Sequence, residues 1–585
     1  MIAQVAEQGL RAIVVVPACD EQDRIGSCLR ALAEQCGVER GAFEVVLVLD
    51  HCHDETRAIA LRAAALAPRL RLIVLDSPFP GAGHARRAGM DFACDRLLEA
   101  GLGQALVAST DADTRVAPDW LAMQLALAAA GARAIGGRID LDLDEAAELA
   151  PAVLRTRSAN ARARHAHVLA WDTRHAGADD DASVRDAVAC RDHHQFSGAS
   201  LAVTAQTYRE IGGLPVVDAL EDEALQRLLE DNRIPIVRSD RVYVTTSART
   251  NGRAPRGLSR DLALADWRAR RSFRSEAFDS ERLVALKGGP ISVILPARDV
   301  ADTIASIIDS LEPLREIGLI DEVLVIDAAS HDGTAAIAAA QGAQVLQEDE
   351  LLRDHGPSRG KGDAMWRALS VARGEIAVFL DADTRDFTAS FVVGLLGPLL
   401  SNPQIRFVKG AFRRPLALGG CVLPGEGGRV TELVARPLVN LYAPHLAGFD
   451  QPLAGEVAAD TELLRSLSFP AGYGVEIANL IDVARLCGMD ALAQVDLGER
   501  QNRHQPLRDL SAMAYAVMVA AAGRLQDTGL HAPPAPGPLA LPPRSGETTT
   551  EMRHVVVFER PPLESLQSDV AREWAVLGSQ SSEVP

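Results

Sequence analysis

Short hydrophobic runs alternate with longer segments of helical periodicity along most of the chain. The runs RAIVVVPA at 11–18 and FEVVLVL at 43–49 are almost continuously apolar, which is typical of strands buried on both faces. A segment with helical spacing follows each run. This order of elements predicts an α/β fold, in which helices flank a mostly parallel sheet.

The pattern of the first half returns in the second half. ISVILPA at 291–297 repeats the first run with its terminal Pro-Ala, and EVLVID at 322–327 repeats the second run with its terminal Asp. The pentapeptide DADTR occurs at 111–115 and again at 381–385, each time after a hydrophobic run. The shared order and similar spacing predict a tandem duplication of one domain.

The repeat suggests three parts of the chain. Gly-Gly-Pro at 288–290 interrupts the pattern just before the second copy begins, so we expect one domain at 1–285 and another at 286–530. The sequence from residue 531 onward is rich in proline, and we expect residues 531–585 to form a partly disordered tail.

Composition narrows the class of protein. With 585 residues the chain is too long for one ordinary core, and its hydrophobic fraction of 48% suffices for globular folding. The net charge of −19 argues against nucleic acid or an anionic membrane as the main partner, because both need a basic surface.

The chain shows no pattern of export or membrane insertion. The eight cysteines are scattered without a C-x-x-C pair and are typical of reduced thiols. The first residues lack the features of a signal peptide, and SAMAYAVMVAAAG at 511–523 is shorter than a membrane span. We therefore expect a cytoplasmic protein without a transmembrane segment.

Proline and aspartate residues end corresponding strands in both halves. In a parallel sheet, ligands bind outside the carboxyl ends of the strands. One such residue would be an ordinary turn residue, but six in matched register favour one binding cleft in each domain. The six residues are Pro17, Asp50 and Asp111 in the first half and Pro296, Asp327 and Asp381 in the second.

The repeated Asp-x-Asp places two carboxylates close together after a strand. Asp111 with Asp113, and Asp381 with Asp383, would repel each other unless a divalent cation lies between them. Mg²⁺ or Mn²⁺ held in this way takes further ligands from substrate phosphates. The pattern thus indicates a nucleotide-diphospho-sugar as substrate, with the metal stabilising the leaving diphosphate.

A strand ending in Pro-Ala, a strand ending in Asp and a later Asp-x-Asp resemble glycosyltransferases of the GT-A fold, in both halves. The second half also contains several longer blocks that resemble glucosyl-3-phosphoglycerate synthases. These blocks are SRGKGDAMWRAL at 358–369, VKGAFRRP at 408–415, GGRVTELVARPL at 427–438, QPLAGEVA at 451–458, FPAGYGVEIANLIDV at 469–483 and QVDLGERQNRHQPL at 494–507. The resemblance implies a retaining enzyme that moves glucose from a nucleotide-glucose donor to 3-phosphoglycerate, and it implies a homodimer.

The same resemblance implies roles for individual residues of the second half. Positions matching the donor-nucleotide site are Pro296, Ala297, Asp327, Ser330, Lys361 and Asp381. Positions matching the acceptor-phosphate site are Gly428, Arg429, Val430 and Thr431. Independently of the resemblance, a glycine loop that opens a helix exposes N–H groups to an anion, although it is also a common helix start. Leu453, Glu476 and Tyr473 match positions near the sugar, and a structural role remains the alternative for the buried Glu476.

Two positions depart from the family pattern. The family's metal-binding histidine corresponds to Asn502, so either Asn502 or the nearby His504 completes the metal site with Asp383. The family's acidic residue after the first strand corresponds to Val300, which leaves the base preference of the donor site open.

The first half resembles inverting transferases of family 2 instead. Its block FSGASLAVTAQTYREIGGLP at 196–215 is followed by Glu221 and Asp222. The resemblance implies that Asp222 is the base that deprotonates the acceptor, as direct displacement requires, while a solvated helix start is the plain alternative. Pro17, Ala18, Asp50 and Asp111 would then bind the donor nucleotide and Asp113 the metal. The sequence names neither its donor nor its acceptor.

Other interpretations fit less well. His51, Cys52 and His53 resemble zinc ligands, but three neighbours on one loop cannot all face one ion. A sugar-phosphate nucleotidyltransferase would need a glycine-rich first loop that both halves lack. One domain could also be a scaffold without catalytic activity.

Overall fold

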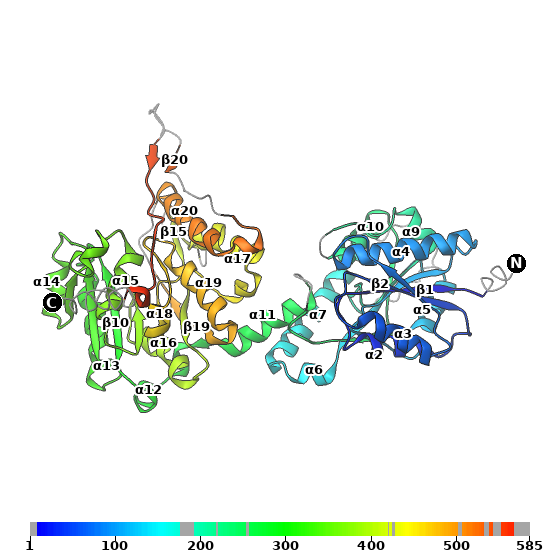
Figure 1. Cartoon of the computed structure of the whole chain (residues 1–585), viewed down its shortest axis with the longest axis horizontal. Coiled ribbons are helices and arrows are strands. Elements are labelled where there is room, and N and C mark those ends of the chain that lie inside the picture. Colours follow the sequence, from blue (N-terminus) through cyan, green and yellow to red (C-terminus); the bar gives the residue numbers. More distant parts are fainter. Residues whose placement is uncertain are drawn as a thin grey trace, which may run out of the picture. The chain divides into compact units, whose positions relative to one another are not determined.

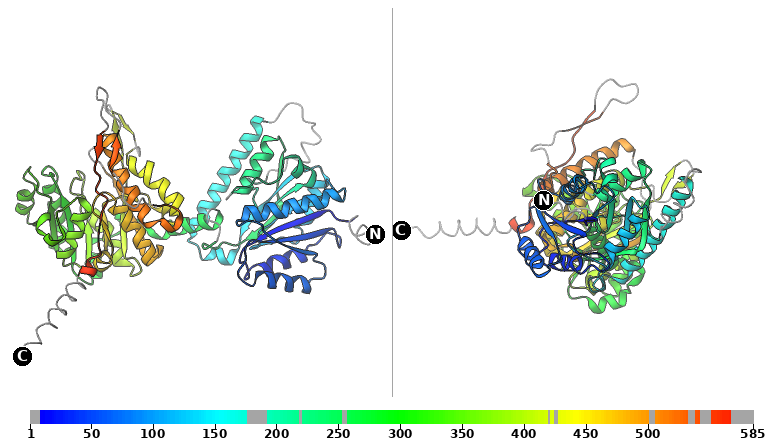
Figure 2. Two further views of the ribbon diagram at one scale, coloured as in Figure 1. Left: turned by 45° about the horizontal axis from the view of Figure 1, so that its top comes forward. Right: turned by 90° about the vertical axis from the view of Figure 1, so that its right-hand side faces the viewer.

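A computed structural model of the chain describes residues 9–175, 192–217, 220–252, 257–418, 421–423, 427–500, 506–531, 538–541 and 551–566. The chain divides into two compact units, Met1–Asp266 and Trp267–Pro585, called the N-terminal and C-terminal units below (Figures 1 and 2). The expected boundary at 285/286 therefore lies inside the C-terminal unit. Strand β9 (Ser272–Arg274) already belongs to the sheet of that unit.

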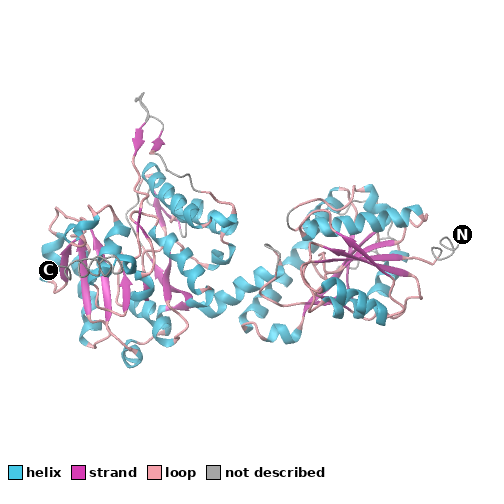
Figure 3. Cartoon of the chain, in the orientation of Figure 1, coloured by secondary structure: helices cyan, strands magenta, loops and turns pink. Residues whose placement is uncertain are grey.

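Each unit is built on one eight-stranded sheet with helices packed against it (Figure 3). The strands of the N-terminal sheet are β1 (Ala12–Ala18), β2 (Phe43–Leu49), β3 (Leu72–Asp76), β4 (Leu106–Ser109), β5 (Thr114–Val116), β6 (Ala134–Leu141), β7 (Leu201–Thr204) and β8 (Ile236–Thr246). Its helices are α2 (Ile25–Ala33), α3 (Thr56–Leu66), α4 (Ala82–Glu99), α5 (Trp120–Ala129), α6 (Leu143–Ala147), α7 (Pro151–His175), α9 (Ala205–Glu210) and α10 (Glu221–Asp231), and α11 (Leu258–Arg271) leads into the second unit.

The C-terminal unit repeats this arrangement. With β9, its sheet contains β10 (Ile291–Ala297), β11 (Glu322–Asp327), β12 (Gln344–Gln347), β13 (Ile376–Phe379), β14 (Phe407–Arg413), β17 (Val457–Asp460) and β19 (Leu492–Glu499). Its helices are α12 (Ser280–Leu286), α13 (Ile304–Glu316), α14 (Thr334–Ala340), α15 (Lys361–Val371), α16 (Ser390–Ser401), α17 (Arg436–Tyr442), α18 (Thr461–Arg465), α19 (Val475–Cys487) and α20 (Leu507–Arg524). Three small pairs of strands lie outside the sheet: β15 (Leu416–Leu418) with β16 (Cys421–Leu423), β18 (Phe469–Pro470) with β22 (Glu559–Arg560), and β20 (Leu539–Leu541) with β21 (Glu551–Arg553).

The two sheets have the same topology over seven strands. Their orders are β3-β2-β1-β4-β7-β6-β8-β5 and β12-β11-β10-β13-β17-β14-β19-β9. In both, one strand (β7 or β17) runs antiparallel to its two neighbours, while the strands on either side pair in parallel. The predicted duplication of a mostly parallel α/β domain is therefore confirmed, and only the last edge strand differs in origin and direction.

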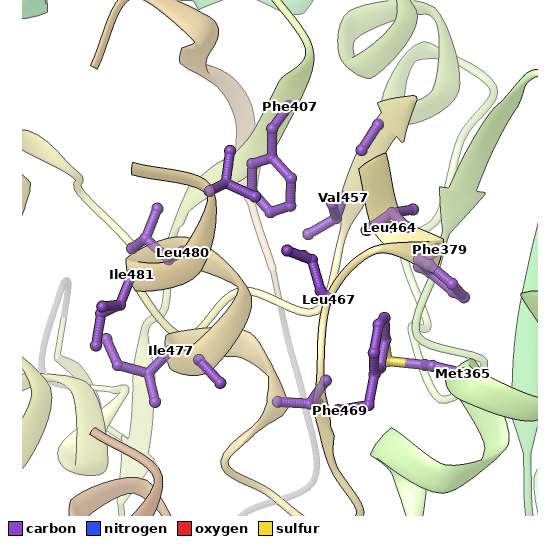
Figure 4. Close-up of a cluster of buried hydrophobic side chains, with 14 of the residues drawn as sticks. Met365, Phe379, Phe407, Val457, Leu464, Leu467, Phe469, Ile477, Leu480 and Ile481 are labelled. Atoms are coloured by element: carbon purple, nitrogen blue, oxygen red, sulfur yellow. The ribbon is translucent and has the colours of Figure 1, made fainter. Parts of the chain in front are cut away.

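Burial on both faces explains the apolar runs. All seven residues of β1 are buried, and so are six of the seven in β10. Helix α13 covers its sheet through Ile304, Ile307, Ile308 and Leu311, the spacing of a single helical stripe. A second core of the C-terminal unit lies where α15 and α19 pack on the sheet, and Figure 4 shows Met365, Ile477 and Leu480 among its side chains.

None of the helices in the described part of the chain combines the length and apolar character that a membrane span requires.

Candidate active sites

The predicted strand ends lie side by side in the C-terminal unit. Ala297 is in register with Asp327 on the neighbouring strand, and Leu380, next to Asp381, donates its N–H to Ile294 of β10 at 3.1 Å. The carboxylate of Asp327 is buried. Its Oδ2 accepts hydrogen bonds from the Ser330 N–H at 3.2 Å and from Gln347 at 3.0 Å. Its Oδ1 has no hydrogen-bond partner among the described atoms, so this oxygen can accept a donor from a ligand.

Lys361 links two acidic residues in the middle of the site. Its ammonium lies 2.5 Å from Asp381 Oδ1 and 2.9 Å from Glu476 Oε1. Burial lowers the pKa of Lys361, but Asp381 and Glu476 outweigh burial and shift the pKa upward. Gly455 leaves room for this cluster, because a Cβ there would lie 2.3 Å from the Lys361 ammonium and 2.4 Å from Asp381 Oδ1.

Arg500 connects the two aspartates of the repeated motif. Its guanidinium contacts Asp381 Oδ2 at 2.9 Å and Asp383 Oδ1 at 3.4 Å, and it also pairs with the buried Glu456. Burial raises the pKa of Asp381, but Lys361 and Arg500 hold it below its ordinary value. Asp381 therefore carries a full negative charge in this cluster. The Asp383 side chain is 51% exposed, so it is the carboxylate of the pair that a cation can reach from solvent.

The other predicted residues of this unit surround the cluster. Gly428 has a φ of +71° and precedes a short π-type turn, Thr431–Ala435, that continues into α17, so the predicted glycine loop does open a helical segment. Arg429 and Val430 lie between that glycine and the turn. Leu453 packs against the core, Tyr473 is 47% exposed, and Glu476 is held by a lysine. Asn502 and His504 lie outside the described residues.

Lys409 is a member of the site that sequence reasoning missed. It stands on β14 and is fully buried, and its ammonium donates to the carbonyl of Ala454 at 2.9 Å and to that of Glu476 at 3.5 Å. It thereby ties the chain beside Leu453 to the start of α19. Burial lowers the pKa of Lys409 to about 8, against the raising effect of Glu476. A lysine inside an apolar strand is the only sequence signal for it.

We expect Lys409 to make the stability of the C-terminal unit depend on alkaline pH. The pKa of Lys409 is about 8 in the folded chain against an ordinary value of 10.5, so between these values the unfolded chain binds more protons and the free energy of unfolding rises with pH. Urea unfolding at pH 7.5, 8.5 and 9.5 measures this rise. Lys409→Met removes the titrating group and should flatten that part of the profile, whereas an unchanged slope in this variant would contradict the assignment.

The N-terminal unit builds a similar cluster from different residues. Arg86 of α4 is buried, and its guanidinium lies 2.7 Å from Asp111 Oδ1 and 3.0 Å from Glu221 Oε1. Arg249, which follows the last long strand, lies 2.9 Å from Asp113 and 2.5 Å from Glu21. Burial and Asp111 raise the pKa of Asp113 to about 6 despite Arg249, so this carboxylate lacks full compensation for its charge.

Two further predicted residues of the N-terminal unit, Asp50 and Asp222, lie outside these ion pairs. Asp50 is buried at the end of β2, next to the end of β1, because its N–H donates to Ala18 at 2.8 Å. Its Oδ2 accepts the N–H of Gly81 at 2.9 Å, at the start of α4. Asp222 stands at the start of α10, and its Oδ2 accepts the N–H of Gly198 at 3.0 Å.

A cavity of about 330 Å³ adjoins Asp113. Its walls carry charges of both signs, and Arg24 pairs with Glu145 at 3.2 Å across one side. The lining residues are Asp23, Arg24, Ser27, Cys28, Asp113, Arg115, Asp142, Glu145 and Ser247. Asp113 is therefore accessible to a polar ligand.

Corresponding clusters in the two units share two basic contacts and differ at other positions. A cation on the helix after the third strand binds the first aspartate and a glutamate in both units, as Arg86 or Lys361. An arginine after β8 or β19 binds the second aspartate in both units, and sequence reasoning missed it although each half has an arginine there. The differences include Asp222 against Ile477 after the glutamate, Glu21 against Val300 after the first strand, and Ser200 against Glu456 before the reversed strand.

Asp20, Cys52 and Asp54 also converge, with one ligand atom of each within 4.8 Å of the others. The hydrogen bonds of two loops explain this convergence. Asp54 accepts the N–H of Gln22 at 3.0 Å and that of Thr56 at 2.9 Å. In the C-terminal unit, Asp332 makes the same two contacts with Ala301 and Thr334, in a loop without cysteine.

Comparisons with known proteins agree with this duplicated architecture. The family model of glycosyl transferase family 2 matches residues 13–180 and 292–391, one region in each unit. The chain is 41% identical over 332 residues to the glucosyl-3-phosphoglycerate synthase of Mycolicibacterium paratuberculosis, and this match covers 55% of the chain and 99% of the relative.

Two solved structures are similar to part of the chain. A mannosyl-3-phosphoglycerate synthase from Rubrobacter xylanophilus is 48% identical, with a TM-score of 0.47, over 52% of the chain and 99% of that protein. A glucosyl-3-phosphoglycerate synthase from Mycobacterium tuberculosis, in complex with Mn²⁺, uridine diphosphate and phosphoglyceric acid, is 41% identical, with a TM-score of 0.45, over 49% of the chain and 95% of that protein.

Proposed function

The chain belongs to the family of glucosyl-3-phosphoglycerate synthases, and on this premise we propose that its C-terminal unit transfers glucose from a nucleotide-diphospho-sugar to 3-phosphoglycerate. The observation that supports this most strongly is the cluster of Lys361, Asp381, Asp383 and Arg500 at the carboxyl ends of the strands. It offers cations for a diphosphate and an accessible carboxylate for a metal in one place.

The donor nucleotide would occupy the strand ends. The unpartnered Oδ1 of Asp327 suits an N–H of a nucleobase, with Pro296, Ala297 and Ser330 beside it. The ammonium of Lys361, which contacts Asp381 and Glu476, would also contact the diphosphate. Val300 is buried in the apolar core, so it offers no charge for discriminating between bases.

The donor set of the site fits a hard divalent cation. Asp383 supplies carboxylate oxygens, which Mg²⁺ and Mn²⁺ prefer, and Asp381 stands beside it. We propose that Asp383 holds the metal together with Asn502 or His504. When bound, the metal would act as a Lewis acid on the leaving diphosphate.

The acceptor would bind on the other side of the donor sugar. Gly428 and the following Arg429, Val430 and Thr431 offer N–H groups and a guanidinium to its phosphate.

We propose retention of configuration, in which the departing phosphate takes the proton of the acceptor hydroxyl. Ile477 stands where the N-terminal unit has Asp222, so this helix offers no carboxylate base there. Leu453, Glu476 and Tyr473 would then position the sugar.

Incubation of the purified protein with 3-phosphoglycerate, Mn²⁺ and a panel of nucleotide-sugars tests this proposal. The panel contains UDP-glucose, GDP-glucose and GDP-mannose, because one similar structure is of a mannosyl-transferring protein. Mass spectrometry should detect a hexosyl-phosphoglycerate that depends on the metal. No such product with any donor would refute the proposed acceptor.

A second proposal concerns the N-terminal unit, which we infer to be an inverting glycosyltransferase. Asp222 supports it, since this carboxylate follows Glu221 of the ionic cluster and can act as base on an acceptor hydroxyl. Pro17, Ala18, Asp50 and Asp111 would bind its donor nucleotide, and Asp113 would bind the metal. The Asp222→Asn variant tests this second proposal.

A further inference from the structure

The end of the described chain packs beside the donor site of the C-terminal unit. Residues 556–561, called the strap, include β22, which pairs antiparallel with β18. The N–H of Ala471, just after β18, donates to the carbonyl of Phe558 at 3.0 Å. In Figure 1 the red end of this segment lies close to α15, and the indole N–H of Trp366 in that helix donates to the carbonyl of Pro561 at 2.8 Å.

Arg560 is the residue through which the strap reaches the donor loop. Its guanidinium is buried and forms a two-pronged pair with Asp363, at 3.0 Å from Oδ1 and 2.7 Å from Oδ2. It also donates to the carbonyl of Pro357 at 3.1 Å and to the carbonyl of His355. The rings of Trp366 and Phe558 lie against the same guanidinium.

Asp363 gathers the whole loop that precedes α15. Its side chain is fully buried and accepts the N–H of Arg359 at 3.0 Å as well as the guanidinium of Arg367 at 3.1 Å. Arg367 in turn donates to carbonyls of the same loop, including that of Gly356 at 2.5 Å. Two arginines, one from α15 and one from the strap, therefore hold residues 351–360 through a single carboxylate.

Lys361 lies between this loop and Asp363, at the first position of α15. The start of the helix is packed tightly, because a Cβ at Gly362 would lie 1.9 Å from the carbonyl oxygen of Pro470, in the strand that pairs with the strap. The direction in which the Lys361 ammonium points is thus set by contacts that the strap shares. A displacement of about 1 Å is enough to weaken a charged contact severely.

We propose that Arg560 is a positioning residue for donor binding, which acts by fixing the loop 351–360 and with it the ammonium of Lys361. This inference rests on the proposed function of the C-terminal unit. Without Arg560, the carbonyls of His355 and Pro357 lose a donor, and the buried carboxylate of Asp363 keeps only Arg367 and the N–H of Arg359. Such groups recover hydration only if the loop moves. The moved loop would present Lys361 poorly to the diphosphate. Acceptor binding would stay unaffected.

The test compares nucleotide binding by the full chain and its variants in titration calorimetry, with UDP or GDP and Mn²⁺ as probes. The variants are Arg560→Ala, Arg560→Lys, Lys361→Ala and the double variant Lys361→Ala with Arg560→Ala. Arg553→Ala is the matched control, since Arg553 belongs to the same tail but pairs with Asp509 of α20 at 3.1 Å.

We expect Arg560→Ala to weaken binding about tenfold or more, and Arg553→Ala to bind as the wild type does. On the Lys361→Ala background, Arg560→Ala should weaken binding far less, because the group that it positions is absent. Thermal unfolding of each variant checks that it folds. Should Arg560→Ala fail to fold, Arg560→Lys decides, since an ammonium cannot span both oxygens of Asp363, and its binding should weaken at least about threefold.

Three results would overturn the inference. Wild-type affinity in the folded Arg560 variant is one, and an equal loss in Arg553→Ala is another. The third is full additivity of the Arg560 and Lys361 losses. A wild-type chain that binds neither nucleotide would instead refute the proposed function itself, and the inference with it.

Discussion

Asp383→Ala is expected to lower kcat/KM for hexosyl transfer to 3-phosphoglycerate by about a thousandfold, because the site would lose its proposed metal ligand and, with it, the cation proposed to stabilise the leaving diphosphate. The free energy of unfolding should change little, since the side chain is 51% exposed. Initial rates measured with saturating Mn²⁺ give the size of the loss.

The chain offers a matched control for this variant. Asp386 is an exposed aspartate in the turn that follows the same motif, and Asp386→Ala should retain wild-type kcat/KM. Raising the Mn²⁺ concentration should restore part of the activity of Asp383→Asn but none of that of Asp383→Ala, because the amide keeps one oxygen. Wild-type rates in Asp383→Ala would show that this carboxylate has no part in the reaction.

Asp222→Asn is expected to lower kcat of the N-terminal unit by about a hundredfold to ten-thousandfold, the usual contribution of a general base. The donor KM should stay within about threefold of the wild type, because the amide keeps the hydrogen bond that Asp222 Oδ2 accepts from Gly198. Transfer to 3-phosphoglycerate should be unchanged. The rate of donor hydrolysis, in which water is the acceptor, can be measured before the natural acceptor is known.

Glu223→Gln is the control for Asp222→Asn. Glu223 is the next residue on α10, but it is exposed and pairs with Arg227 one helical turn later. If Glu223→Gln and Asp222→Asn lower the rate equally, a general effect on α10 explains both, and Asp222 is not the base. If neither changes donor turnover, the N-terminal unit acts as a scaffold.

The positions of the carboxylates could be predicted from sequence because strand ends are a local property. Each apolar run stops at an aspartate that ends the strand or follows it closely, so Asp50, Asp111, Asp327 and Asp381 were identifiable once the runs were aligned. The repeat then placed all four at equivalent edges, and the paired sheets confirm that order.

The partners of these carboxylates depend on tertiary structure instead. Arg86 and Lys361 occupy different turns of equivalent helices, at the fifth position of α4 and the first of α15, yet both reach the first aspartate. The spacing of residues along the sequence does not reveal that Arg86 and Lys361 have equivalent partners. Lys409 and Arg560 were also missed, because their contacts join residues 45 and 197 positions apart. The proline-rich sequence before the strap predicted a partly disordered tail, so the buried contacts of Arg560 were not expected.

The differences between the two units have a common physical meaning. In the N-terminal unit Arg249 takes its second acid from Glu21 in the first loop, and in the C-terminal unit Arg500 takes it from Glu456. Each arginine therefore keeps a glutamate partner, although this glutamate comes from a different place in the cluster in each unit. The base position has no such substitute, since Ile477 lies in the core (Figure 4). The two units should therefore differ in stereochemistry while they share donor chemistry.

The configuration of the product formed from an α-linked nucleotide-sugar and 3-phosphoglycerate distinguishes retention from inversion at the C-terminal unit. Proton NMR of the isolated hexosyl-phosphoglycerate reports the anomeric configuration. We expect an α-linked product that the wild type and Asp222→Asn both form and that Asp383→Ala does not. A β-linked product, or one that disappears in Asp222→Asn, would contradict this expectation.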